Sequence, residues 1–239
     1  IGSSFSVIDI LSVLYSGSAN IAPENYGNME SDIVILSKGH AAAAMYAILA
    51  LKKFLDLDKV DSYCIDGSSL GGHITSKNNI GIELATGSLG HGFPYGLGIA
   101  ISQKKHNVGS RTFVILSDGE CDEGTTWESA LIASHQRLNN LFVIIDRNRL
   151  QSIKNTEQTI ALEPLRTKWE AFNWEVIEID GHSHSDLNNS LKLNKRPTCI
   201  IANTVKGKGV SFMENDNNWH YKCPTLEEYI QAKSEIENS

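Results

Sequence analysis

Two polar residues stand just after apolar runs of the sequence, where their side chains could bind a metal ion. Asp118 follows the run 112–116, and Asn148 follows the run 141–145. One expected helix separates the two runs, so we predict that the two strands are adjacent or nearly so. Asp118 and Asn148 would then lie side by side at the carboxyl ends of the strands, where ligands of open parallel sheets collect. A carboxylate and an amide oxygen are hard ligands of the kind that Mg²⁺ or Ca²⁺ accepts.

The residues next to Asp118 could also receive a phosphate. Gly119 lets backbone N–H groups approach a ligand closely, and a helix beginning near Gly124 would direct its positive end toward an anion. Each feature also has an ordinary structural interpretation. Asp-Gly after a strand is often a turn, and Asn after a strand is often a helix cap. Their joint position at two successive strand ends makes a site as good an interpretation as a structural role, and the residues alone leave both open.

The elements that must position these residues alternate between strand and helix. The strands are apolar throughout, which is typical of a parallel sheet covered on both faces by helices. We therefore predict an α/β fold with three αβα layers and a single domain over 1–239. The strands are expected at 32–36, 112–116, 141–145, 174–179 and 199–202, and the helices at 6–15, 38–54, 90–102, 125–136, 165–172 and 186–193.

The composition argues against several functions. The net charge is −7 and Lys and Arg form no cluster, so nucleic acid is not an expected partner. No apolar run reaches the roughly 18 residues that span a bilayer. The four cysteines form no C-x-x-C pair and have no zinc spacing, which favours reduced thiols and a cytoplasmic location. The polar segment 214–239 is expected to wrap the domain or to be partly mobile.

Several segments together resemble a transketolase. Ser117-Asp118-Gly119 with Asn148 is similar to the diphosphate-binding motif of thiamine-diphosphate enzymes, although the family usually has Gly where Ser117 stands. The match runs in order over nearly the whole chain, and the length is that of the diphosphate-binding half of a split transketolase. The other segments that carry it are 37–40 (Ser-Lys-Gly-His), 86–92, 118–124, 180–182 (Asp-Gly-His) and 206–209 followed by Trp219-His220.

The resemblance implies transfer of a two-carbon ketol unit from a ketose phosphate to an aldose phosphate. Thiamine diphosphate would carry the carbon chemistry, while the protein supplies orientation, charge and proton transfer. Mg²⁺, with Ca²⁺ or Mn²⁺ as substitutes, would be bound by the side chains of Asp118 and Asn148 and the carbonyl of Leu150. The further cofactor contacts implied are His40, Gly87, Leu89, Gly119 and Glu120.

The resemblance also assigns catalytic residues. His40, His73 and His220 fall on active-site histidines of the family, and an imidazole that titrates near neutrality can both donate and accept a proton. From the residues alone, each would more often be a surface or core histidine. Glu123, and more loosely Glu128, are implied at a dimer interface, where the alternative is a favourable charge at a helix start.

Other residues receive no firm role. His91 stands where the family commonly has Gln, and His182 lies in a family-like turn without a clear chemical task. Lys206 and Lys208 could be solvated loop residues or could lie beside the cofactor, and the sequence does not decide between these positions. His106, His135 and His184 are expected to be ordinary surface or core residues.

The resemblance implies a partner chain. In the family, the glutamate that protonates the cofactor and the main phosphate-binding arginines belong to the pyrimidine-binding domain, which no segment here resembles. We therefore expect a separate chain with that domain and an α2β2 assembly of the two. Two alternatives stay open: another thiamine-diphosphate enzyme (related to 1-deoxyxylulose-5-phosphate synthase, a 2-oxo-acid dehydrogenase subunit or a rare-sugar transketolase), or a non-catalytic binding or regulatory partner.

Overall fold

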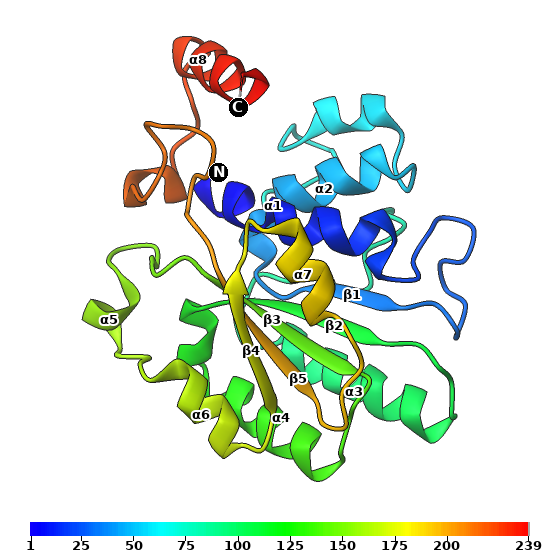
Figure 1. Ribbon diagram of the computed structural model, residues 1–239. Helices are drawn as coiled ribbons and strands as arrows, with labels where there is room; N and C mark the ends of the chain where they lie inside the picture. The colour runs from blue at the N-terminus through cyan, green and yellow to red at the C-terminus, as the bar shows by residue number, and fades with distance from the viewer. Residues whose placement is uncertain (239) are drawn as a thin grey trace.

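The computed structural model describes residues 1–238 and is built around one parallel sheet (Figure 1). Within these residues the sheet has five strands in the order β1-β2-β3-β5-β4. Every neighbouring pair is parallel, as the apolar strands predict. The strands are β1 (Ile33–Leu36), β2 (Thr112–Ser117), β3 (Leu141–Arg147), β4 (Glu175–Asp180) and β5 (Thr198–Asn203).

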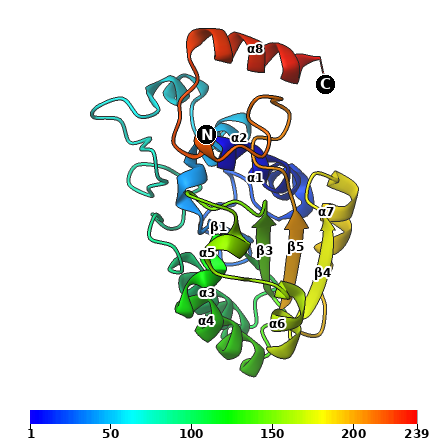
Figure 2. The same ribbon diagram turned by 90° about the vertical axis from the view of Figure 1, so that its left-hand side faces the viewer.

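Helices cover both faces of the sheet and give the three expected layers. Figures 1 and 2 show α1, α2 and α7 on one face and α3, α4 and α6 on the other. The helices are α1 (Gly2–Val13), α2 (Ala42–Leu51), α3 (Gly92–Lys105), α4 (Gly124–His135), α5 (Thr156–Thr159), α6 (Leu165–Ala171), α7 (His184–Ser190) and α8 (Leu226–Glu237). Shorter helical turns lie at Leu14–Ser18, Gly39–Ala41, Leu57–Ser62, Gly119–Asp122 and Asn217–His220.

Alternate strand residues divide between two apolar cores. Phe113 and Ile115 of β2 pack with α1 and α2 residues, whereas Val114 and Leu116 pack with α3 and α4 residues. Successive side chains of a strand point to opposite faces, so a strand with helices on both sides must be apolar at every position. This requirement explains why β2 and β3 read as continuous apolar runs.

The register of β2 and β3 brings their carboxyl ends together. Ser117 pairs with Asp146 at the last position of the β2–β3 ladder, so both strands end at the same edge of the sheet. Asp118 is the next residue after β2, and Asn148 is the next residue after β3. The prediction that β2 and β3 are neighbours is confirmed.

The structure differs from the expected elements near the two ends of the chain. α1 begins at Gly2 rather than at residue 6, with no side-chain cap, so Ser3 and Ser4 belong to the helix instead of preceding it. The polar segment after residue 214 contains α8, which begins with a capping box between Thr225 and Glu228. Glu235 of α8 accepts hydrogen bonds from the N–H and hydroxyl of Ser211, so the helix is attached to the loop after β5.

Among residues 1–238, no helix has both the length and the apolar character needed to cross a membrane.

Candidate functional site

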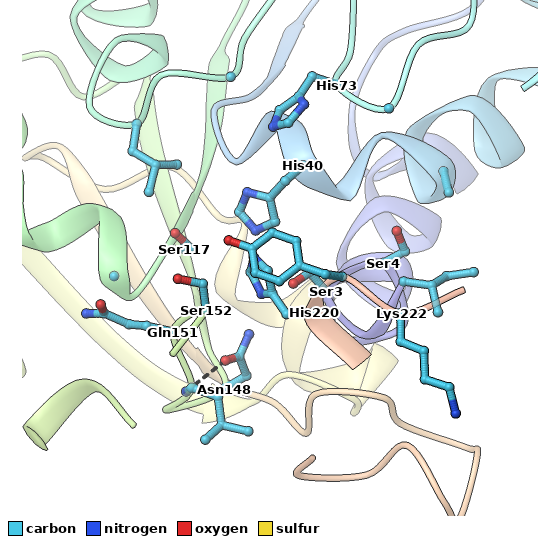
Figure 3. A pocket seen from close by; sticks show the side chains of 18 of the residues that line it. Ser3, Ser4, His40, His73, Ser117, Asn148, Gln151, Ser152, His220 and Lys222 are labelled. Carbon is cyan, nitrogen blue, oxygen red and sulfur yellow. Dashed lines mark hydrogen bonds between the residues drawn. The ribbon is translucent and has the colours of Figure 1, made fainter. Parts of the chain in front are cut away.

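A cavity of about 510 Å³ opens at the carboxyl ends of β2 and β3 (Figure 3). Its walls come from the start of α1, the turn before α2, the loop 63–89, the two strand ends and the segment 220–224. Figure 3 shows His40 between His73 and His220, with Asn148 and Gln151 in the same pocket. Besides the three histidines, six residues expected at the cofactor or metal line this cavity: Gly87, Leu89, Asp118, Gly119, Asn148 and Leu150.

Asp118 is nearly inaccessible to solvent, and one of its carboxylate oxygens is fully occupied. Oδ2 accepts from the N–H of Arg149 at 2.6 Å and from Nη1 of Arg147 at 3.1 Å. Among residues 1–238, Oδ1 accepts only from the N–H of Gly119, at 2.8 Å. Burial raises the pKa of Asp118 to about 6, although the Arg147 cation opposes that shift. A carboxylate oxygen has two lone pairs, so Oδ1 retains one acceptor position.

Asn148 adds a second oxygen that could bind a metal ion beside Asp118. Its Oδ1 accepts from the N–H of Leu150 at 3.0 Å, and its side chain is 5% exposed. An amide oxygen also has two lone pairs, so this acceptor keeps free capacity. A carboxylate and an amide oxygen suit a hard divalent cation, and Leu150, whose carbonyl is the third expected ligand, lines the same cavity. The residues present therefore fit the expected metal ion.

Two of the cavity histidines, which are half-buried, do not titrate near neutrality as the sequence led us to expect. Burial lowers the pKa of His40 to about 2, and the positive charge of Lys38 acts in the same direction. Burial also lowers the pKa of His220 to about 4, with the Lys206 cation as the second cause. Both imidazoles are therefore neutral at pH 7, and each has one donor and one acceptor nitrogen.

Close backbone packing holds His40 and His73 at the cavity. A Cβ at Gly39 would lie 2.2 Å from the carbonyl oxygen of Thr86, so only glycine allows these two segments to touch. Thr86 also donates from its hydroxyl to the carbonyl of Leu36 at 2.7 Å. The loop that carries Gly87 is thereby fixed against the end of β1.

The structure distinguishes the two lysines that the sequence left undecided. Lys208 is 46% exposed and lies 3.8 Å from Glu214, as expected for a loop lysine. Lys206 is fully buried beside the cavity wall, with Nζ 2.9 Å from Nδ1 of His220. Burial lowers the pKa of Lys206 to about 8. Because an ammonium group only donates, the contact makes Nδ1 of His220 the acceptor and leaves the proton on Nε2.

Three charged residues next to the site are not singled out by sequence reasoning. Lys38 and Asp146 form an ion pair with both side chains 0% exposed. Asp146 also accepts hydrogen bonds from the hydroxyls of Ser6 and Thr204. Arg147, the last residue of β3, contacts the Asp118 carboxylate. The available signal was the pair of charged residues, 146 and 147, within a fully buried strand.

Two glutamates to which the resemblance gives a role do not line this cavity. The Glu120 carboxylate does not line the cavity, because it accepts from Ser37 and, at 2.8 Å, from the N–H of Gly90. Glu123, which the resemblance counts among the catalytic residues and places at a dimer interface, is exposed at the residue before α4, and both roles stay predictions. The first turn of α4 does not line the cavity, whereas Asp118 and Gly119 do, so the expected contact of this helix end with an anion also stays a prediction.

The remaining histidines and Glu128 lie outside the cavity. His91, His106 and His135 are exposed, as is Glu128. His182 and His184 contact the two carboxylate oxygens of Asp9 at 2.7 and 2.8 Å. His182 also accepts from the N–H of Val205 at 2.8 Å, so its role in this structure is to hold the start of the loop after β5 against α1.

Comparison with known proteins agrees with this arrangement. The family model described as "Transketolase, thiamine diphosphate binding domain" matches residues 1–236. The chain is 38% identical over 240 residues to one of the subunits of the apulose-4-phosphate transketolase of Phocaeicola vulgatus, covering 99% of this chain and 85% of that protein. It is 37% identical over 241 residues to a 6-deoxy-6-sulfo-D-fructose transketolase subunit of a Clostridium species, covering 99% and 88%.

The fold is also found in solved transketolases. The structure of transketolase from Campylobacter jejuni superposes with a TM-score of 0.89 at 28% identity, over 95% of this chain but only 37% of that one. The chain therefore corresponds to somewhat more than a third of a full-length transketolase. Since the family model spans nearly all of its residues, the chain belongs to the transketolase family through its thiamine diphosphate-binding domain.

Proposed function

We propose that this chain is the diphosphate-binding subunit of a two-chain transketolase that transfers a two-carbon ketol unit from a ketose phosphate to an aldose phosphate. The observation that carries this proposal is the convergence of Asp118, Asn148 and the histidines on one cavity at the ends of β2 and β3. The family membership supplies the reaction class, and the cavity supplies residues suited to it.

Mg²⁺ would be held by oxygens of this chain. Asp118 and Asn148 would bind it with their side chains and Leu150 with its carbonyl, while Gly119 would contact the diphosphate. Gly87 and Leu89 would meet the aminopyrimidine through their backbone. Bound thiamine diphosphate supplies the carbon nucleophile of ketol transfer, while the surrounding residues bind, orient and handle protons.

The histidines would position the sugar as neutral hydrogen-bonding groups. Because His40 and His220 remain uncharged at pH 7, each has one N–H that can donate to a sugar hydroxyl. The second nitrogen of His40 can accept from another hydroxyl, whereas that of His220 already accepts from Lys206. Lys206 fixes the donor of His220 at Nε2. We infer that these contacts orient the substrate, and that proton transfer by an imidazole accompanies them only where a bound group raises its pKa.

The proposal includes a second chain that carries the pyrimidine-binding domain. It is supported by two relatives whose names make each of them one subunit of a larger enzyme: one belongs to an apulose-4-phosphate transketolase and the other to a 6-deoxy-6-sulfo-D-fructose transketolase. Glu123 and Glu128, exposed in this chain, are the acids we place at a subunit interface. An α2β2 assembly and a cytoplasmic location remain predictions from the sequence.

The test is reconstitution of the chain with its partner. Thiamine diphosphate and Mg²⁺ are titrated by calorimetry into this chain alone and into the complex, followed by an assay with a panel of ketose and aldose phosphates that includes apulose 4-phosphate. We expect tight cofactor binding and ketol transfer only in the complex. Release of CO₂ from pyruvate, with no ketol transfer, would contradict the proposal and indicate a decarboxylating enzyme.

A further inference from the structure

Arg147 is a buried cation that contacts the candidate metal ligand from inside the protein. It ends β3, its side chain is 3% exposed, and Nη1 donates to Oδ2 of Asp118 at 3.1 Å. The same nitrogen donates to the hydroxyl of Thr156 at 2.7 Å. None of the roles proposed above uses this residue.

The other end of the guanidinium is fixed by the segment that follows the site. Nη2 donates to Glu163 at 2.8 Å and to Glu157 at 3.3 Å, and these carboxylates are 52% and 41% exposed. A guanidinium is planar and presents its donors in a fixed fork, so partners on both nitrogens determine its orientation. The position of the donor to Asp118 is therefore set by four contacts rather than one.

The contacts of Asp118 leave its two oxygens with different capacities. Oδ2 already accepts from Arg147 and from the N–H of Arg149, which uses both of its lone pairs. Oδ1 accepts from Gly119 alone. Asp118 can therefore offer one oxygen to a metal ion and not two.

We propose that Arg147 is a positioning residue that keeps Asp118 a one-oxygen ligand and thereby makes the site selective for Mg²⁺ over Ca²⁺. Mg²⁺ requires a near-ideal octahedron, whereas Ca²⁺ takes more ligands and readily accepts both oxygens of a carboxylate. Blocking Oδ2 withholds the additional ligand from Ca²⁺, while Oδ1 can still bind Mg²⁺. The inference rests on the proposed metal site at Asp118 and Asn148.

Metal selectivity separates this role from a purely structural one. Removing the charge of Arg147 changes the electrostatic attraction for both divalent ions in the same direction, so their affinity ratio isolates the ligand geometry. The experiment titrates Mg²⁺ and Ca²⁺ separately, in the presence of thiamine diphosphate, into the complex of this chain with its partner. Calorimetry gives the dissociation constant of each ion without an activity assay.

Arg147→Met should lower the preference for Mg²⁺ over Ca²⁺ by about tenfold, the lower end of the effect of residues that orient metal ligands. Glu163→Gln removes the charge from one partner of Nη2 and so weakens the hold on the guanidinium. It should shift the ratio of Mg²⁺ to Ca²⁺ affinity in the same direction by a smaller amount. Arg166→Met is the matched control, because Arg166 is 49% exposed and pairs with Glu170 on α6. It should leave the ratio at the wild-type value.

An unchanged ratio in folded Arg147→Met would overturn the inference. If that variant fails to fold, an unchanged ratio in Glu163→Gln overturns it instead. Failure of the wild-type complex to bind either ion would refute the metal site itself, and with it the proposed function. The two failures are therefore distinguishable in one set of titrations.

Discussion

The imidazole rings of His40 and His220 lie 5.3 Å apart between centroids, although the residues belong to opposite ends of the chain. His40 lies in the turn before α2, and His220 ends the short turn Asn217–His220. The buried cations Lys38 and Lys206 flank the pair and disfavour a further positive charge. Two neutral rings can share this space, whereas two protonated rings would repel each other.

This arrangement predicts that acid destabilises the fold through His40. The folded-state pKa of His40, about 2, lies below the ordinary value of 6.5, so the unfolded chain binds a proton more readily. The contribution of neutral His40 to stability is complete above pH 6.5 and is lost as the pH falls toward the folded-state value. From pH 7 to pH 5, the free energy of unfolding measured in urea should fall by up to about 2 kcal/mol more for wild type than for His40→Gln.

The comparison with a variant is needed because other groups titrate in this range. Burial raises the pKa of Asp118 to about 6. Protonation of this carboxyl therefore stabilises the fold as the pH falls, which is opposite in sign to the effect of His40. His135→Gln is the matched control, since His135 is exposed near the end of α4, and it should follow the wild-type pH dependence. Equal pH dependence in wild type and His40→Gln would show that His40 is not held neutral.

The buried ion pair of Lys38 and Asp146 predicts strong coupling between the two residues. Asp146→Asn should lower the free energy of unfolding by about 3–5 kcal/mol, because it leaves the ammonium of Lys38 buried without a counter-charge. Urea denaturation of the folded chain measures the loss.

The double variant Lys38→Met with Asp146→Asn provides the control for this pair. Removing both charges should recover much of the loss, since an apolar replacement of a buried pair is often close to neutral. If the losses of stability from the two single substitutions simply add in the double variant, the two charges do not stabilise each other, contrary to the structure.

Gly39 predicts a sharp contrast between two glycine substitutions. Gly39→Ala should lower the free energy of unfolding by about 1–3 kcal/mol, because its Cβ would meet the backbone of Thr86. Gly124→Ala is the control, because no heavy atom lies within 4 Å of a Cβ built there. Thermal unfolding of both variants tests the contrast, and equal melting temperatures would contradict the close packing of these segments.

Asp118→Ala should remove metal-dependent cofactor binding while leaving the fold intact. In the complex, the affinity for thiamine diphosphate with Mg²⁺ should fall by more than about tenfold, since the charged ligand is lost. The fold should persist because Arg147 keeps its contacts with Glu157 and Glu163. Circular dichroism and calorimetry report the two properties separately, and Asp66→Ala, at an exposed loop position, should change neither. Undiminished affinity in Asp118→Ala would refute the metal assignment.

The sequence predicted the fold and the centre of the site because local signals determine both. Continuous apolar runs imply strands buried on both faces, and such strands in turn imply a parallel sheet between helices. The order of β2, α4 and β3 then places Asp118 near Asn148, because each residue follows closely on an apolar run that forms most of its strand. The structure confirms that the two strands are neighbours.

Side-chain direction and long-range pairing were not readable in the same way. Glu120 follows Asp118 by two residues, yet its carboxylate points toward Ser37 and Gly90, which no local pattern specifies. The partner of Asp146 is Lys38, which lies far away in sequence, and no local pattern indicates that these two residues pair. The lowered pKa of Lys206 likewise depends on burial, which only the assembled structure provides.

Ser117 and Arg147 end their strands one residue before Asp118 and Asn148, so no flexible linker separates either side chain from the sheet. The side chains of Asp118 and Asn148 are therefore immobilised when the chain folds, and they have little conformational entropy left to lose when a ligand binds. The same directness makes the two junctions intolerant of length changes. An added residue at either junction would rotate the following side chain out of place, whereas insertions at 106–111 or 136–140, at the amino ends of these strands, would leave both side chains where they are.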